Sequence, residues 1–166
     1  MIILVASIVI LFCALAIQEI GGFKPCVFCL YQRYPYAIAI VLSTVSLCTS
    51  GRLRDRGNLA AFLVAGCSVA FATGAAIALY HVGIERGWFQ GLASCGGIYG
   101  EIKTVEELKA RLEIEVAVRC DDVTWSLIGV SLAGYNFFIS VILCLASCLS
   151  VMFHFRRRTS NESTKT

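Results

Sequence analysis

Four long stretches of the chain are almost purely apolar, and polar segments separate them. They cover residues 1–17, 34–50, 59–82 and 125–155. Each approaches or exceeds the length of about 20 residues that a helix needs to cross a bilayer. No Asp, Glu, Lys or Arg lies well inside any stretch, and the alternation typical of a membrane β-barrel is absent. The pattern therefore predicts an all-α membrane protein, built as a four-transmembrane-helix bundle.

Two connecting segments, residues 18–33 and 83–124, then lie on the same side of the membrane. In the longer one, Thr104 and Glu107 have the spacing of a capping box, in which the two side chains cap the start of a helix. Val105, Leu108 and Leu112 follow at helical spacing. The segment predicts a short amphipathic helix on the membrane surface. A helix packed against other loop residues fits the same pattern.

The composition agrees with a membrane protein and excludes two other classes. Of 166 residues, 58% are hydrophobic and only 15% are charged. A soluble domain carries about 25% charged residues, which its surface needs for solvation. Intrinsic disorder requires low hydrophobicity, so it is excluded as well.

The net charge of +3 is distributed unevenly between the two predicted sides. Residues 51–58 and 156–166 together hold seven basic and two acidic side chains, a net of +5, whereas the opposite side has a net of −2. Lys and Arg favour the cytoplasmic side of a membrane protein. We therefore expect one membrane domain over residues 1–155, a cytoplasmic basic and polar tail over residues 156–166, and both termini inside. The charge gives little support to a nucleic-acid partner.

The nine cysteines fall into two groups. Five lie within the apolar stretches, where a thiol acts as a small hydrophobic group, namely Cys13, Cys48, Cys67, Cys144 and Cys148. The other four lie on the outer side, namely Cys26, Cys29, Cys95 and Cys120. An even number suits two disulfides in an oxidising compartment, but three pairings are possible from the sequence alone.

Cys26 and Cys29 form a CxxC motif that follows Pro25 and precedes the second apolar stretch. At the start of a helix, free backbone amides and the helix dipole favour a thiolate, the form that attacks disulfides. Arg33 lies four residues after Cys29 on the same helix face, where it would stabilise an anion. The spacing favours redox chemistry. A structural disulfide is the main alternative, and a zinc site would need further ligands nearby.

His81 lies at the outer end of the third apolar stretch, at the membrane depth expected for Cys29 and Arg33. A single interfacial histidine is more often a hydrogen-bonded packing residue. At this depth it could also donate a hydrogen bond to a carbonyl group of a lipid-soluble ligand. His81 is therefore a second candidate for ligand binding beside Arg33.

Two extended motifs resemble the DsbB family of bacterial disulfide bond formation proteins. The first is KPCVFCLYQR at residues 24–33, with Gln18 eight residues before Cys26. The second is CDDVTWSL at residues 120–127, followed by Gly129, Ser131, Ala133, Gly134, Tyr135 and Asn136. The four predicted crossings and the two outer cysteine pairs agree with the same family. The resemblance extends to about Phe155.

The resemblance implies a quinone-dependent thiol oxidase of the bacterial inner membrane. Such an enzyme reoxidises the periplasmic, thioredoxin-like oxidase DsbA and passes the electrons to ubiquinone or menaquinone. It would support disulfide formation in exported proteins, with its redox cysteines on the periplasmic side.

The resemblance also implies a role for each outer cysteine. Cys95 would form a mixed disulfide with DsbA, and Cys120 would exchange with Cys26. Cys29 would be the thiolate beside the quinone. Arg33 would stabilise this thiolate and the quinone, and His81 would lie near the quinone. No metal is implied.

Three other functions fit parts of the sequence. One is a related oxidase that serves a dedicated partner such as an arylsulfate sulfotransferase. Another is an enzyme of the vitamin K epoxide reductase type, although that family usually places its CxxC motif in a later helix. The third is a structural four-helix membrane protein or transporter subunit with two inert disulfides.

Overall fold

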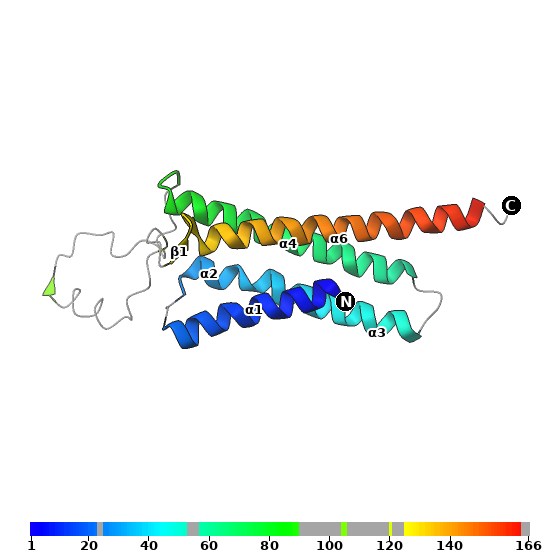
Figure 1. Cartoon of the computed structure of the whole chain (residues 1–166), viewed down its shortest axis with the longest axis horizontal. Helices are drawn as coiled ribbons and strands as arrows, with labels where there is room; N and C mark the ends of the chain where they lie inside the picture. Colours follow the sequence, from blue (N-terminus) through cyan, green and yellow to red (C-terminus); the bar gives the residue numbers. More distant parts are fainter. Residues whose placement is uncertain (23–24, 53–56, 90–103, 106–119, 121–124, 164–166) are drawn as a thin grey trace.

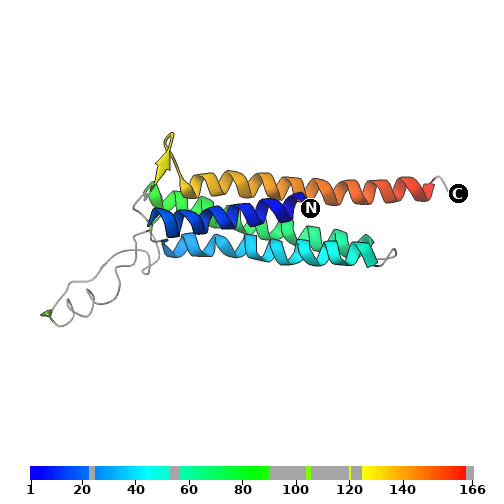
Figure 2. The same ribbon diagram turned by 60° about the horizontal axis from the view of Figure 1, so that its bottom comes forward.

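The computed structural model describes residues 1–22, 25–52, 57–89, 104–105, 120 and 125–163. Within these residues the chain is mainly helical. Four long helices lie side by side along the long axis of the molecule (Figures 1 and 2), namely α1 (Ile2–Gly21), α3 (Arg33–Arg52), α4 (Gly57–Glu85) and α6 (Leu132–Ser163). A five-residue helix, α2 (Val27–Tyr31), precedes α3 at one end.

Three of the four long helices are long and apolar enough to cross a membrane over their described residues. These are α1, α4 from Leu59 to Glu85, and α6 from Leu132 to Arg157. Much of their surface consists of exposed large hydrophobic side chains, such as Phe12, Phe62 and Phe138. Such a surface suits contact with lipid rather than with water. A membrane crossing by α3 stays a prediction.

The helices pack around a core that joins α3, α4 and α6. Its buried members are Tyr36, Ala39, Cys67, Phe71 and Leu143. Gly74 allows α4 to approach α3 closely, because a Cβ atom at this position would lie 3.2 Å from the Pro35 ring. Small residues at helix interfaces commonly serve this purpose in membranes.

A β-hairpin precedes the last helix. Strands β1 (Ser126–Leu127) and β2 (Val130–Ser131) pair antiparallel, with Ser126 opposite Ser131. The two-residue turn places Ile128 and Gly129 at φ values of 54° and 75°, as a type I′ turn requires. The sequence pattern predicts that the apolar stretch continues from residue 125, but the helix begins at Leu132. Ser131 ends the hairpin and caps α6, since its hydroxyl accepts a hydrogen bond from the Gly134 amide at 3.2 Å.

Two predicted features lie partly or wholly outside the described residues. The surface helix around residues 104–112 is described only at Thr104 and at the exposed Val105, so it stays a prediction. Cys95 lies outside the described residues altogether. At the other end of the chain, α6 continues through Arg156 and Arg157 into the predicted tail.

Candidate redox site and membrane cavity

The CxxC motif forms the start of α2. Cys26 is the N-cap residue, and its sulfur accepts a hydrogen bond from the Cys29 amide at 3.2 Å. Both residues carry free thiols, and their sulfur atoms lie 2.8 Å apart. Cys26 is buried, whereas Cys29 is partly buried. The helix start thus holds two thiols in position to form a disulfide with little movement.

The two thiols of the motif differ in acidity. The Cys26 thiol donates a hydrogen bond to the Cys29 sulfur, which lowers the pKa of Cys29 even though burial opposes ionisation. The same hydrogen bond, together with burial, raises the pKa of Cys26 to about 12. Cys29 is therefore the more acidic thiol of the pair, and Cys26 keeps its proton to a higher pH.

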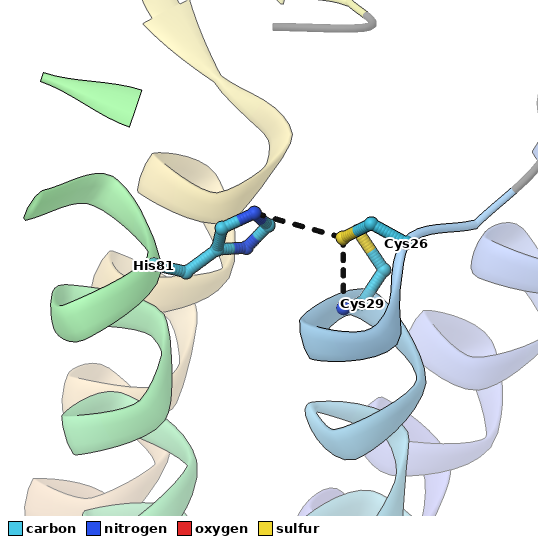
Figure 3. A group of neighbouring side chains, drawn as sticks. All are labelled: Cys26, Cys29 and His81. Carbon is cyan, nitrogen blue, oxygen red and sulfur yellow. Dashed lines mark hydrogen bonds between the residues drawn. The ribbon is translucent and has the colours of Figure 1, made fainter. Parts of the chain in front are cut away.

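His81 reaches the motif from α4. Its side chain is buried and points across to Cys26 (Figure 3), with Nε2 at 3.6 Å from the Cys26 sulfur. Cys120 is also buried and packs in one cluster with Cys26, Phe28 and Ile84. A small chamber of about 30 Å³ lies between Cys26, Cys29, His81, Glu85, Trp125, Leu132 and Ala133. On this side the motif therefore faces a third cysteine and polar groups, and Cys26 and Cys29 both line the chamber.

A much larger cavity of about 340 Å³ lies on the Cys29 side, between α1, α3 and α6. Its wall is mainly apolar, and residues from the CxxC segment and the helices around it form its polar part: Gln18, Cys29, Gln32, Arg33, Tyr36, Tyr135 and Asn136. A volume of this size, with apolar walls and a few polar groups, is typical of sites for small organic ligands.

Comparison with known proteins identifies the family. The model of the family described as disulfide bond formation protein DsbB matches residues 1–150. The chain belongs to the DsbB family. Disulfide bond formation proteins B from Polaromonas sp. and Methylobacillus flagellatus are 26% and 27% identical to it, over 92% and 90% of this chain and 89% of each relative. An uncharacterised protein of Rickettsia prowazekii is 22% identical over 87% of this chain and 81% of its own length. No solved structure matches the chain.

Membership of the DsbB family points to a membrane oxidoreductase that forms disulfide bonds. Four of the outer residues expected to act in such chemistry lie together here: Cys26, Cys29, His81 and Cys120. Arg33 lies with Cys29 on the cavity wall. His81 lines the small chamber and is absent from the wall of the large cavity. The sulfur that it contacts is that of Cys26, at 3.6 Å.

The three side chains of Cys26, Cys29 and His81 are close enough to be considered as metal ligands, since their donor atoms lie within 4.8 Å of one another. Two thiolates on a tetrahedral zinc ion, with Zn–S bonds of about 2.3 Å, lie about 3.8 Å apart. The 2.8 Å between these sulfurs is much shorter. As it stands, the DsbB-family site suits a hydrogen-bonded dithiol better than zinc.

The structure adds polar residues that the sequence pattern did not single out as site residues. Gln32, Tyr36 and Asn136 form a continuous hydrogen-bonded chain that ends on His81. Glu85 lies one helical turn after His81, with its carboxylate 4.0 Å from the imidazole, and accepts a hydrogen bond from the Ser131 hydroxyl. In the sequence, Asn136 could have been noticed because it is a polar residue in an apolar stretch, and polar residues inside membrane helices are often functional or paired with one another.

Proposed function

We propose that the protein is an inner-membrane thiol oxidase that reoxidises a periplasmic DsbA-like dithiol protein and passes the electrons to a membrane quinone. The observation that carries the proposal is the position of the CxxC motif between two different surroundings. Cys26 packs with Cys120, and Cys29 lies on the wall of the large apolar cavity. A dithiol placed in this way can receive electrons from a cysteine on one side and deliver them on the other.

The cavity has the properties that a quinone site requires. A quinone supplies a two-electron sink that side chains lack. Its flat ring and isoprenoid tail match an apolar wall formed by helices α1, α3 and α6. The Arg33 guanidinium and the amide groups of Gln32 and Asn136 offer hydrogen-bond donors for its carbonyl oxygens. Ubiquinone and menaquinone share this chemistry, and either fits the proposal.

The exchange steps proceed through single attacks at sulfur. The soluble dithiol attacks a Cys95–Cys120 disulfide and bonds to Cys95, which releases the Cys120 thiolate. Cys120 then attacks Cys26 in the Cys26–Cys29 disulfide, so that Cys29 leaves as a thiolate. The second thiol of the soluble protein displaces Cys95 and leaves that protein oxidised. Cys95 then attacks Cys120, which restores the Cys95–Cys120 disulfide and releases Cys26, which takes up a proton. The lowered pKa of Cys29 makes it the better leaving group of the pair. The Cys29 charge is thus released on the wall of the cavity that Arg33 also lines.

The charge distribution supports the orientation. The ends of α3 and α6 and the start of α4 lie at the end of the molecule opposite the CxxC motif (Figure 1). In the sequence, residues 51–58 and 156–166 adjoin these helix ends and are rich in arginine. Because basic segments favour the cytoplasm, the CxxC end would face the periplasm. A periplasmic site would meet an oxidising compartment and soluble dithiol partners.

The proposal is tested by mixing the purified full-length protein, in detergent with ubiquinone-1, with a reduced DsbA-like protein and following quinone absorbance. We expect reduction of the quinone, and its loss in Cys29→Ser. Cys144→Ser is the matched control, because Cys144 lies on α6 away from the site. Reduction that persists in Cys29→Ser would refute the assigned relay. No reduction by the unmodified protein, with menaquinone analogues tested as well, would favour a structural protein with inert disulfides.

A further inference from the structure

A chain of hydrogen bonds runs from the wall of the large cavity to the Cys26 sulfur. The Tyr36 hydroxyl donates to Asn136 Oδ1, and Asn136 Nδ2 donates to Gln32 Oε1 at 2.8 Å. Gln32 Nε2 then lies 3.1 Å from His81 Nδ1. On the far side of the ring, His81 Nε2 lies 3.6 Å from the Cys26 sulfur. Residues of α3, α4 and α6, with Gln32 between α2 and α3, thus converge on one thiol.

The direction of each bond in this chain follows from its atoms. An amide oxygen only accepts, so the Tyr36 hydroxyl must be the donor to Asn136. An amide nitrogen only donates, so Gln32 Nε2 must donate to His81. His81 Nδ1 is therefore the acceptor and carries no hydrogen. The hydrogen of the neutral ring is on Nε2, the atom that faces Cys26.

We propose that Gln32 and Asn136 are positioning residues that hold His81 with its hydrogen on Nε2, so that this N–H group stabilises Cys26 as a thiolate. The inference rests on the proposed function and goes beyond it, because it assigns His81 to the sulfur of Cys26 rather than to the quinone. Gln32 and Asn136 act through His81 and do not touch the reacting sulfur.

The chemistry requires such a donor at Cys26. When the dithiol is reoxidised, the Cys26 sulfur bonds to the Cys29 sulfur, and the pair passes two electrons to the quinone. Cys29 enters this step already ionised, and Cys26 gives up its thiol proton. That proton and one more from water complete the hydroquinone. The pKa of Cys26 is raised to about 12, so its proton is the difficult one to remove.

The groups that face the imidazole determine what it can do. They are Cys26 and Cys29 from the α2 segment, Glu85 from α4, and the backbone of Cys120, which is a further hydrogen-bond partner of His81. Glu85 lies 4.0 Å from Nε2, which is beyond hydrogen-bond distance. Nε2 therefore lies closer to the Cys26 sulfur, at 3.6 Å, than to the Glu85 carboxylate.

The first test measures alkylation of Cys26 against pH in a Cys29→Ala background, in which Cys26 is the one cysteine left in the motif. Iodoacetamide reacts with the thiolate, and fragment mass spectrometry locates the product. We expect His81→Leu and Gln32→Leu to lower the Cys26 thiolate fraction about tenfold, since the loss of a hydrogen bond to a charged group raises a pKa by about one unit. Thr73→Val, an exposed hydroxyl on α4, is the control.

A conservative variant separates a donor from a base. In His81→Gln the amide nitrogen lies about where Nε2 was, so it can donate to sulfur but cannot take up a proton. We expect His81→Gln to keep most of the Cys26 reactivity that His81→Leu loses. Equal loss in both variants, with both proteins monodisperse and equally heat-stable, would overturn the proposal.

The second test observes the ring directly. The protein has two histidines, so ¹⁵N-histidine labelling gives two sets of signals, and His154→Gln assigns them. We expect His81 near pH 8 to carry hydrogen on Nε2 in the unmodified protein, and to lose this preference in Gln32→Leu. Hydrogen on Nδ1 in the unmodified protein would also overturn the proposal. Neither test uses a quinone or a partner protein. Both results can therefore be interpreted even if the protein proves not to reduce a quinone.

Discussion

The two sulfurs of the CxxC motif lie 2.8 Å apart, and both residues line the small chamber, but Cys29 alone of the two also lines the large cavity. On the Cys29 side lies a cavity of about 340 Å³ with a mainly apolar wall. On the Cys26 side lies a chamber of about 30 Å³ that His81 and Glu85 help to line, and Cys120 packs against Cys26. The large cavity has room for a small organic molecule, whereas the small chamber does not.

This difference originates in the local backbone. Cys26 is the N-cap residue and Cys29 lies in the first turn of α2, so the Cys29 amide donates to the Cys26 sulfur and the Cys26 thiol donates to the Cys29 sulfur. Cys29 becomes the acidic thiol and Cys26 the protonated one. Two thiols separated by two residues can thus differ strongly in acidity because of their positions at a helix start.

The largest expected difference between Cys26 and Cys29 is in their rates of thiol alkylation. In the reduced protein at pH 8, we expect iodoacetamide to modify Cys29 at least about a hundredfold faster than Cys26, because only thiolates react. The pKa of Cys29 is lowered, so its thiolate persists as the pH falls below 9, the ordinary value for the thiol. Cys26 stays protonated until the pH approaches 12. Fragment mass spectrometry of the peptide that contains both cysteines measures the ratio. Equal rates would show that the two thiols are not distinguished.

Arg33 gives the next largest effect and concerns the Cys29 side alone. We expect Arg33→Ala to raise the quinone KM about tenfold, since a charge-assisted hydrogen bond is lost from the cavity wall. The exchange between Cys120 and Cys26 should slow less than quinone reduction, because Arg33 is absent from the small chamber and acts on the exchange only through the charge released on Cys29. Arg33→Lys keeps the charge, so its quinone KM should lie between those of the unmodified protein and Arg33→Ala. The KM is measured by quinone absorbance and folding by the melting temperature. If Arg33→Ala lowers the melting temperature as severely as it weakens quinone use, the role of Arg33 is structural.

Much of the fold follows from the lengths of the apolar stretches. Each stretch corresponds to a long helix, because an apolar run in lipid has to satisfy its own backbone hydrogen bonds. The hairpin before α6 escaped prediction since Ile128 is an unusual residue for a positive φ, and the sequence there reads as a continuation of the span. Its strands are two residues long, too short for an alternating pattern.

The site was predictable where its residues are close in the sequence. Cys26, Cys29 and Arg33 share one motif, so local spacing was sufficient to group them. The cavity could not be predicted, because α1, α3 and α6 form it only once the chain has folded. The contact of Gln32 with His81 spans 49 positions of sequence, and its contact with Asn136 spans 104. No local pattern carries such contacts.

The smallest expected effect concerns the shape of the cavity rather than its charges. Ala14 lies on the cavity wall in α1, and Ala14→Phe would place a ring in space that a quinone would occupy. We expect the quinone KM to rise about threefold to fivefold, because a helix at the edge of the bundle can shift to make room. Cys29 alkylation should stay unchanged, since Ala14 is absent from the small chamber and bonds neither thiol.

The neighbouring residue provides the control for this change. Leu15 is 42% exposed and does not line the cavity, so Leu15→Phe adds a ring to the outer face of the same helix. Its KM should match that of the unmodified protein, as measured by quinone absorbance with a short-chain quinone. A KM raised equally by both substitutions would mean that α1 acts through its general packing. A KM raised by neither would mean that the quinone is bound elsewhere than between α1, α3 and α6.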